Sequence, residues 1–225
     1  MDNVDCYTGR VTPERRYSIQ TGAMRLFVAA WPAESALGAL ADVRPITETP
    51  DLRWVPPVNW HVTLAFLGSV PDDEHDELVE ALRSIGRLAP PCAAILGPET
   101  TVLGTRVLCV PVGGLGELAL MVRECTAPFN RSKDREESFV GHLTLARANR
   151  GRSVPLVATG VPVSSVWPVT EIRLVSSTTR PDGAEYSQTA LVALDGRDSG
   201  STYEHVFGDT VTGSPRFRLP DTPLP

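Results

Sequence analysis

Residues 61–67 read HVTLAFL and residues 142–148 read HLTLARA, two heptapeptides of one pattern. Four of the seven positions are identical, and two of the four histidines in the chain open the two copies. Both copies lie in β-like stretches rich in apolar and β-branched residues. The repeat therefore predicts two equivalent strands, each beginning with His-x-Thr. The alternative to a functional role for the histidines is the duplication of a purely structural strand.

The spacing within each copy places two polar groups on one face of a strand. Side chains alternate along a strand, so His61 and Thr63 point the same way, about 7 Å apart, as do His142 and Thr144. Ala65 and Ala146 would continue that face with little bulk. The opposite face is expected to pack under helices through Val62, Leu64, Phe66, Leu143 and Leu145.

Two imidazoles with two hydroxyls suit displacement at phosphorus. One imidazole can take a proton from the nucleophile and the other can protonate the leaving oxygen, because the ordinary pKa of histidine lies near 6.5. Threonine hydroxyls can donate hydrogen bonds to phosphate oxygens. A metal site is less well supported, since neither copy has Asp, Glu or Cys at ligand spacing. His75, in an acidic helix start, and His205 are interpreted as structural or surface residues.

Composition narrows the classes of function. The chain has 225 residues, 42% hydrophobic and 21% charged, as in ordinary globular proteins. A net charge of −6 argues against binding nucleic acid over a broad basic surface, although one phosphate could still enter a local basic pocket. Lys133 is the only lysine, against twenty arginines, and it lies outside any P-loop or adenylation motif. Nucleotide-driven chemistry is therefore disfavoured.

Cysteine usage and the chain start predict a cytoplasmic protein. The cysteines form no metal-binding or redox spacing and are expected to be free thiols in a reducing compartment; they are Cys6, Cys92, Cys109 and Cys125. No apolar run approaches the ~20 residues that cross a membrane, and residues 1–23 lack the apolar region of a secretory signal.

The order of predicted elements mixes helices with antiparallel hairpins, which indicates the α+β class. Strands are expected at 24–31, 52–55, 58–67 (ending at Gly68), 93–103, 106–112, 139–147, 157–166, 172–177 and 185–194. Helices are expected at 33–43, from 71 to 86 or 90, and at 115–129. Residues 1–23 are interpreted as a loose leader, 24–195 as the folded domain, and the Pro- and Gly-rich 196–225 as a flexible tail whose Phe207 and Phe217 could dock on the surface.

These residues resemble the two-histidine (2H) phosphoesterase superfamily, in particular its RNA 2′,3′-cyclic phosphodiesterase branch, also called 2′-5′ RNA ligase. The similar stretches, in order, are MRLFVAAWP, LRWVPPVNWHVTLAFLG, FVGHLTLARA and RLVSSTTRPDGAEYSQTALVAL. The resemblance implies a bilobal fold with two antiparallel sheets flanking a central cleft, helices on the outer faces and a pseudo-twofold axis. It also implies hydrolysis of a 2′,3′-cyclic phosphate to a 2′-phosphate without cofactor or metal, or the reverse 2′-5′ joining of RNA without ATP.

The resemblance further implies roles for individual residues. His61 would protonate the leaving 3′ oxygen and His142 would activate water, an assignment that the residues alone leave open. Thr63 and Thr144 would hold the phosphate. Arg147 matches an arginine common after the second motif, but strict alternation turns it away from His142, so it can help only where the strand ends or bulges. Gly141 departs from the family, which usually has proline before the second histidine.

Two other functions remain open from sequence. One is a phosphodiesterase for a small cyclic nucleotide, such as an ADP-ribose cyclic phosphate, in place of RNA ends. The other is a non-catalytic module that binds nucleotides or RNA. In each case the partner is an RNA end or nucleotide, no membrane is involved, and a monomer is expected. Aromatic residues available to stack on a base are Phe27, Trp54, Trp60 and Tyr186, and the alternative is that all four belong to the core.

Overall fold

The computed structural model describes residues 22–47, 49–132, 138–180 and 183–198. The predicted leader up to residue 21 and the predicted tail from residue 199 lie outside the described residues, as do Cys6, Lys133, His205, Phe207 and Phe217. The strands are β1 (Ala23–Ala30), β2 (Leu52–Trp54), β3 (Val62–Pro71), β4 (Cys92–Leu96), β5 (Thr101–Leu103), β6 (Val107–Gly113), β7 (His142–Ala148), β8 (Ser165–Val169), β9 (Glu171–Arg180) and β10 (Gly183–Ala193). The helices are α1 (Glu34–Ala41), α2 (Arg44–Thr47), α3 (His75–Leu88) and α4 (Gly116–Thr126), with short 3-10 turns at Pro57–Asn59, Asp72–Glu74, Ala127–Phe129 and Leu156–Ala158.

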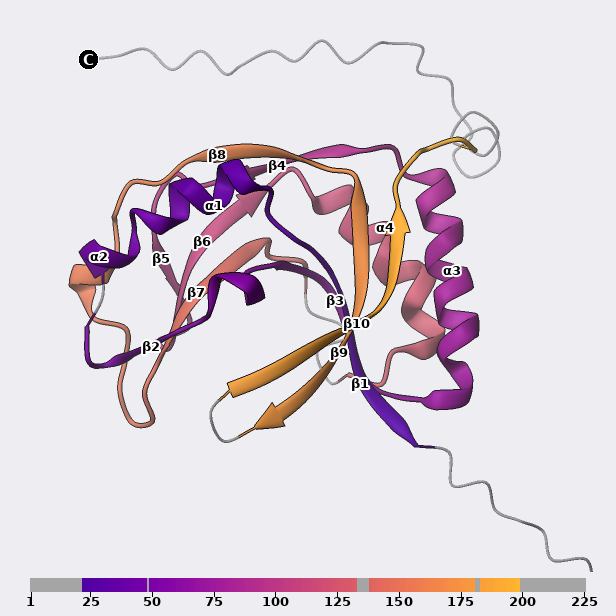
Figure 1. Cartoon of the computed structure of the whole chain (residues 1–225), viewed down its shortest axis with the longest axis horizontal. Helices are drawn as coiled ribbons and strands as arrows, with labels where there is room; N and C mark the ends of the chain where they lie inside the picture. The colour runs from indigo at the N-terminus through magenta and orange to yellow at the C-terminus, as the bar shows by residue number, and fades with distance from the viewer. Residues whose placement is uncertain (1–21, 48, 133–137, 181–182, 199–225) are drawn as a thin grey trace, which may run out of the picture.

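The described strands form one curled sheet with two halves. Its order is β10-β9-β1-β3-β7-β6-β4-β8, with β2 beside β7 and β5 beside β6, and the pairs between these strands are antiparallel. The halves meet where β3 pairs with β7 through Val62 and Leu143. Because both strands begin at this point and run in opposite directions, each continues into its own half (Figure 1). Val62 and Leu143 occupy the same position in the two heptapeptides, so the sequence repeat is a structural pseudo-twofold.

Helices cover the sheet on both halves, which confirms the predicted α+β class. Helix α4 packs against β3 and helix α3 against β10 in one half, whereas α1 packs against β8 in the other (Figure 1). Helix α3 buries one stripe at helical spacing, composed of Leu78, Val79, Leu82 and Ile85. Apolar side chains of both halves join one large core cluster, so the two lobes share a core.

A β-bulge interrupts both motif strands at the same motif position. The pairing of β3 with β1 steps from Ala65 to Thr63 and leaves Leu64 without a partner. The pairing of β7 with β6 steps from Ala146 to Thr144 and leaves Leu145 unpaired. An extra residue shifts the alternation of side chains beyond it by one position.

The bulge corrects three predicted orientations. Phe66, predicted to lie under the helices, instead lies opposite Phe27 and is 48% exposed. Ala65 and Ala146, predicted on the polar face, are buried in the core. Simple alternation therefore holds up to the threonine of each motif and fails after it.

Three predicted strand boundaries were also wrong. Strand β3 continues through Gly68, which takes a positive φ of 74°, to Pro71. The stretch 93–103 divides into β4 and β5 around the cis Gly97–Pro98 bond. Most of 157–166 is irregular, because its backbone bonds to a loop instead of a strand: Val163 N–H donates to Pro98 and Thr100 N–H donates to Val161. In the described part of the chain, no helix is long and apolar enough to cross a membrane.

Candidate active site

His61 and His142 come together where the two motif strands meet. His142 is the first residue of β7, and His61 immediately precedes β3. Antiparallel pairing through Val62 and Leu143 places His61 level with Thr144, and Thr63 level with His142. The four residues predicted as the polar pairs therefore share one small area of the sheet, here called the site face.

The two imidazoles are held in the same way. His61 Nδ1 lies 2.7 Å from the carbonyl oxygen of Asn59, and His142 Nδ1 lies 2.8 Å from that of Val140, in each case two residues earlier. A carbonyl can only accept, so each Nδ1 carries a hydrogen. Nε2 of a neutral ring then has a free lone pair, and it is the nitrogen left to exchange protons with a ligand.

Thr63 and Thr144 are half-buried, and neither hydroxyl bonds to another described residue. Both are available as donors to a ligand. Thr144 lies opposite Cys109 of β6, which is 2% exposed, so a small buried side chain supports this part of the site face.

Arg147 lies beyond the bulge of β7, the condition under which it could face the histidines. The bulge at Leu145 turns the strand so that Arg147 lies on the same face as His142 and Thr144. Its positive charge acts on His61 and lowers the pKa of that imidazole. Arg147 is exposed and makes no ion pair with a described residue, so its charge is free to act on an anion at the site face.

Three aromatic rings surround His61. Their ring centroids lie 5.0 Å (Phe27), 5.2 Å (Trp31) and 5.4 Å (Tyr186) from that of the imidazole, and Trp31 stacks on it. Trp31 is itself fixed by a hydrogen bond from its Nε1 to the carbonyl oxygen of Val58 and by the guanidinium of Arg173, which lies 5.0 Å from the centroid of its ring.

This enclosure changes the protonation of His61. Burial lowers its pKa from 6.5 to about 4, because the charged ring loses its hydration. The hydrogen bond to Asn59 opposes this effect, and electrostatic interactions with the nearby His142 and Arg147 add to it. His61 is therefore neutral at physiological pH.

Trp31 was missed as a site residue in the sequence. Phe27, Ala29 and Trp31 alternate along and just beyond β1, so the period of two could have placed Trp31 on the face of Phe27. Among the aromatic residues considered for stacking, Phe27 and Tyr186 lie at the site face, whereas Trp60 is buried in the core. Trp54 is half-buried and packs against the core.

The remaining candidate groups lie elsewhere. His75 is on α3 beside Asp76, bordering a groove of about 550 Å³ between α3 and β10. Cys92, Cys109 and Cys125 are free thiols whose pKa values are raised, mainly by burial, as expected for unreactive cysteines. Across residues 22–198, leaving out the undescribed gaps, no three His, Cys, Asp or Glu side chains are grouped to hold a metal ion.

Comparison with known proteins confirms the family resemblance. Residues 30–94 match the family described as LigT like Phosphoesterase. An RNA 2′,3′-cyclic phosphodiesterase of Geobacillus stearothermophilus is 31% identical over 164 residues, which cover 69% of this chain and 52% of that protein. The chain thus spans about half the length of this curated relative.

Solved structures share the fold. The crystal structure of TT0787 of Thermus thermophilus superposes with a TM-score of 0.68 at 29% identity, over 77% of this chain and 99% of that one. Escherichia coli LigT complexed with 3′-AMP has a TM-score of 0.58 at 26% identity, over 77% and 99% of the two chains. In sequence and in fold, this chain is similar to the LigT-like phosphoesterases.

Proposed function

We propose that the chain is a phosphodiesterase that opens a 2′,3′-cyclic phosphate at an RNA end to a 2′-phosphate, using His61 and His142 as an acid–base pair. The observation that carries this proposal is the symmetric pair of imidazoles, each with Nδ1 tied to the carbonyl two residues earlier and Nε2 left free. The RNA 2′,3′-cyclic phosphodiesterase named among the relatives and the 3′-AMP bound to LigT support this choice of substrate.

In this reaction, a water oxygen attacks phosphorus while His61 Nε2 takes its proton. The bond from phosphorus to the 3′ oxygen breaks, and His142, protonated, gives a proton to that oxygen. A 2′-phosphate and a 3′ hydroxyl result, and proton exchange with solvent resets the two rings. His61 is given the role of base because its lowered pKa keeps it unprotonated. These roles are the reverse of those implied by the resemblance.

The remaining residues of the site face would bind the substrate. Thr63 and Thr144 donate hydrogen bonds to the non-bridging oxygens, and Arg147 stabilises the negative charge that grows on them. The half-buried Tyr186 and the exposed Phe66, which both pack on the buried Phe27, offer ring faces to a nucleobase. The same groups would serve 2′-5′ joining of RNA without ATP, in which the 5′ hydroxyl of a second strand attacks phosphorus in place of water, His61 takes its proton, and the bond to the 3′ oxygen breaks as His142 protonates it.

The first test is single replacement of the histidines. His61→Ala and His142→Ala should each lower kcat on a 2′,3′-cyclic phosphate by at least about 10²-fold, as expected for loss of a general acid or base. Far-UV circular dichroism should show both variants folded. His75→Ala, outside the site, is the matched control and should retain activity. Full activity in both site variants would refute the acid–base pair.

A sulfur substitution separates the two roles. A cyclic substrate whose leaving 3′ oxygen is replaced by sulfur needs no proton donor, because a thiolate is a good leaving group. His142→Ala should regain most of its lost rate on this substrate, whereas His61→Ala should not. The opposite pattern would assign the acid role to His61.

Metal dependence distinguishes this proposal from a two-histidine metal site. Activity should be unchanged after dialysis against EDTA, because protons and arginine charge suffice for the chemistry proposed. Loss of activity on EDTA treatment with recovery on adding a divalent metal would favour the metal site. Tight binding of a 2′-phosphate product without turnover of any cyclic phosphate would favour the non-catalytic module.

A further inference from the structure

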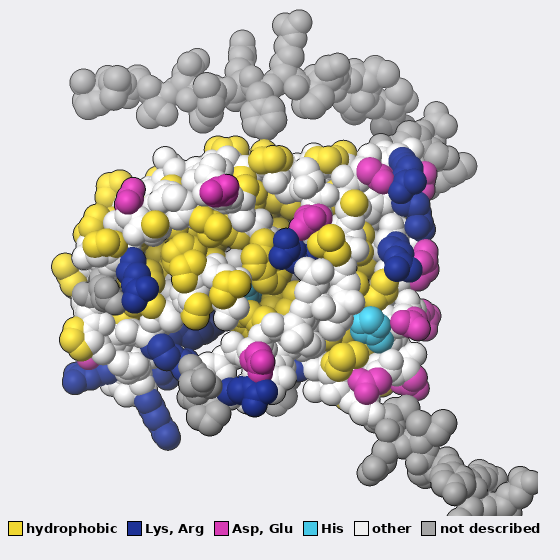
Figure 2. Space-filling view, in the orientation of Figure 1, with side chains coloured by type: hydrophobic (Ala, Val, Ile, Leu, Met, Phe, Trp, Pro, Cys, Tyr) yellow, Lys and Arg dark blue, Asp and Glu magenta, His cyan; other side chains and the backbone are white. Residues whose placement is uncertain are grey.

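Charge is distributed unevenly over the molecule. Residues 72–88, which include α3, contain six acidic residues against two arginines, whereas residues 139–160, which include β7, contain three arginines and no acid. Figure 2 shows basic side chains gathered over the end of the molecule that holds β2 and β7, and acidic side chains along α3. The basic area adjoins the site face even though the whole chain has a net charge of −6.

Two arginines stand directly opposite each other in this area. Arg53 of β2 pairs with Arg147 of β7, so both side chains lie on the site face. Like charges at directly opposed positions of an antiparallel pair are destabilising. Neither arginine has an ion-pair partner among the described residues. A bound anion between them would relieve this repulsion.

A built turn presents another arginine just beyond β7. In the turn 149–152, Arg152 N–H donates to Asn149 at 2.9 Å, and Gly151 takes the positive φ of 77° that a type II turn requires after Arg150. Asn149 fastens the turn to the start of β2 through bonds to Pro50 and Asp51. Arg150 is therefore held at an exposed corner and has no acidic partner among the described residues.

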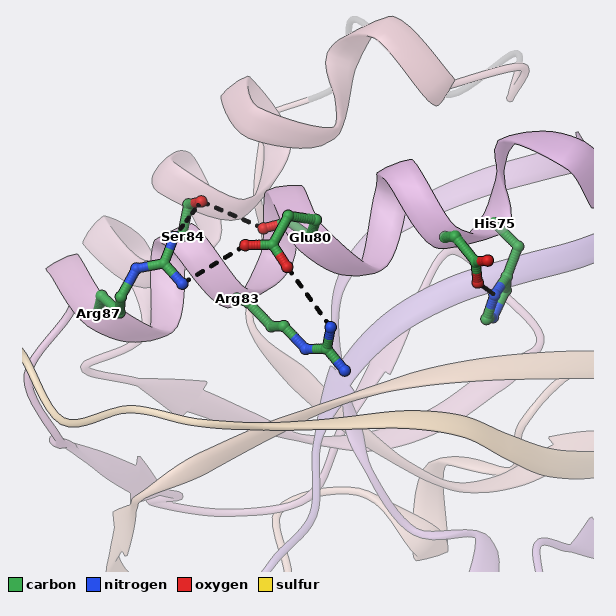
Figure 3. Close-up of polar contacts among 6 residues, drawn as sticks. His75, Glu80, Arg83, Ser84 and Arg87 are labelled. Atoms are coloured by element: carbon green, nitrogen blue, oxygen red, sulfur yellow. Dashed lines mark hydrogen bonds and ion pairs between the residues drawn. The ribbon is translucent and has the colours of Figure 1, made fainter.

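The arginines of α3, in contrast, have an acidic partner. Figure 3 shows Arg83 and Arg87 both directed to the carboxylate of Glu80, at 3.4 Å and 3.6 Å. Their charge is balanced locally, and they lie away from the histidine pair. Arg53, Arg147 and Arg150, by contrast, have no ion-pair partner among the described residues and gather around the paired ends of β2 and β7.

Arg147 is the member of this group that reaches the histidines, because its charge acts on His61, whereas Arg53 and Arg150 continue the group away from them. His142 and Arg147 are five positions apart along β7, on the order of 16 Å along the backbone at ~3.3 Å per position, and the long side chain of Arg147 spans part of this gap. Arg150 lies three positions further along the chain. A cyclic mononucleotide has a single phosphate, which the histidines and threonines would hold. It would leave Arg53 and Arg150 without an anion, whereas a longer RNA brings further phosphates at successive nucleotides.

We propose that Arg53 and Arg150, continuing from Arg147, bind the phosphodiester backbone of the RNA strand upstream of its cyclic end. This inference rests on the proposed function and makes an oligonucleotide the preferred substrate over a free cyclic nucleotide. Each arginine–phosphate contact releases counterions, so its effect depends strongly on salt.

The test compares two substrates and two double variants. Arg53→Gln/Arg150→Gln should lower kcat/KM for an eight-nucleotide RNA ending in a 2′,3′-cyclic phosphate about tenfold at about 50 mM salt, chiefly through KM. The slope of log kcat/KM against log salt should become less negative by about 1.4, because each phosphate that an arginine no longer neutralises on a single strand changes it by ~0.7. Turnover of cytidine 2′,3′-cyclic phosphate should be unchanged. The matched control is Arg83→Gln/Arg87→Gln, which should affect neither substrate.

Other outcomes would overturn the inference. They are an equal loss on both substrates, no loss on the RNA, or the same loss in the α3 control. Failure of the proposed function looks different, because wild-type protein would then turn over neither substrate. In that case, fluorescence anisotropy of a labelled eight-nucleotide RNA still tests whether the arginines contact the strand. Arg53→Gln/Arg150→Gln should weaken binding of this RNA about tenfold, and unchanged binding would refute the arginine contacts.

Discussion

At the scale of single residues, the two histidines have the same backbone contact but different surroundings. His61 is enclosed by Phe27, Trp31 and Tyr186, and His142 begins a strand at the more open side. The sequence repeat makes the two residues look equivalent. Their difference comes from β1 and β10, which bring aromatic rings to one half of the site.

The lowered pKa of His61 predicts how stability depends on pH. In the folded chain His61 stays neutral down to about pH 4, whereas in the unfolded chain it takes up a proton near pH 6.5. Between these values the unfolded state binds more protons, so the free energy of unfolding falls as pH is lowered. The stability that the neutral His61 imidazole contributes to the folded state is fully present above about pH 6.5. On the order of 3 kcal/mol of it is lost by pH 4.

Urea denaturation of wild type and His61→Gln at about pH 7.5 and about pH 4.5 measures this effect. Wild type should lose more stability between the two pH values than His61→Gln does. His75→Gln, which removes a histidine from α3, should follow wild type. Equal losses in wild type and His61→Gln would contradict a buried neutral imidazole.

At the scale of elements, the bulge after each threonine shapes the site face. It turns Phe66 in one half and Arg147 in the other toward the ligand side, at equivalent motif positions. The bulge that Arg147 needs in order to face a ligand is therefore present in β7. The two motifs are alike up to the threonine and diverge at the position that offers an aromatic or a cationic contact.

Gly141, the residue immediately before β7, is predicted not to tolerate a side chain. A Cβ at Gly141 would collide with the carbonyl oxygen of Val112 and press on the ring of Phe139, while Gly141 C=O accepts the hydrogen bond of Val112 N–H. Gly141→Ala should therefore lower the free energy of unfolding by about 1–3 kcal/mol. Proline, usual at this position in the family, meets the same obstacle here.

A glycine in α1 provides the matched control. Gly38 has no atom within 4 Å of an added Cβ, so Gly38→Ala should raise the free energy of unfolding by about 0.5–1 kcal/mol through helix propensity. Thermal or urea denaturation of Gly141→Ala and Gly38→Ala measures whether the free energy of unfolding falls in the first variant and rises in the second. A neutral Gly141→Ala would show that β7 and β6 can separate at this point.

At the scale of the whole molecule, the two halves are joined at the pair that aligns the histidines. Leu143 is fully buried opposite Val62. Leu143→Ala should cost about 2–5 kcal/mol of stability, as for other buried leucines, and should also lower kcat because it loosens the alignment of the two strands.

Leu96→Ala in β4 separates these two effects. Leu96 is 1% exposed, so its loss should cost similar stability, but it lies away from the joint between β3 and β7. Assays well below both unfolding temperatures should show reduced kcat in Leu143→Ala and near-normal kcat in Leu96→Ala. Equal kcat in the two variants would contradict a role of the joint in aligning the site.

The sequence by itself determined the α+β class, the two motif strands and the shared face of each His-x-Thr pair, because those features follow from local periodicity and turn residues. It did not determine the bulges, the aromatic enclosure of His61 or the arginine pair of β2 and β7. Each of these depends on which strand lies beside which and in what register. Register is decided by packing between segments far apart in the chain, so only the tertiary structure could reveal it.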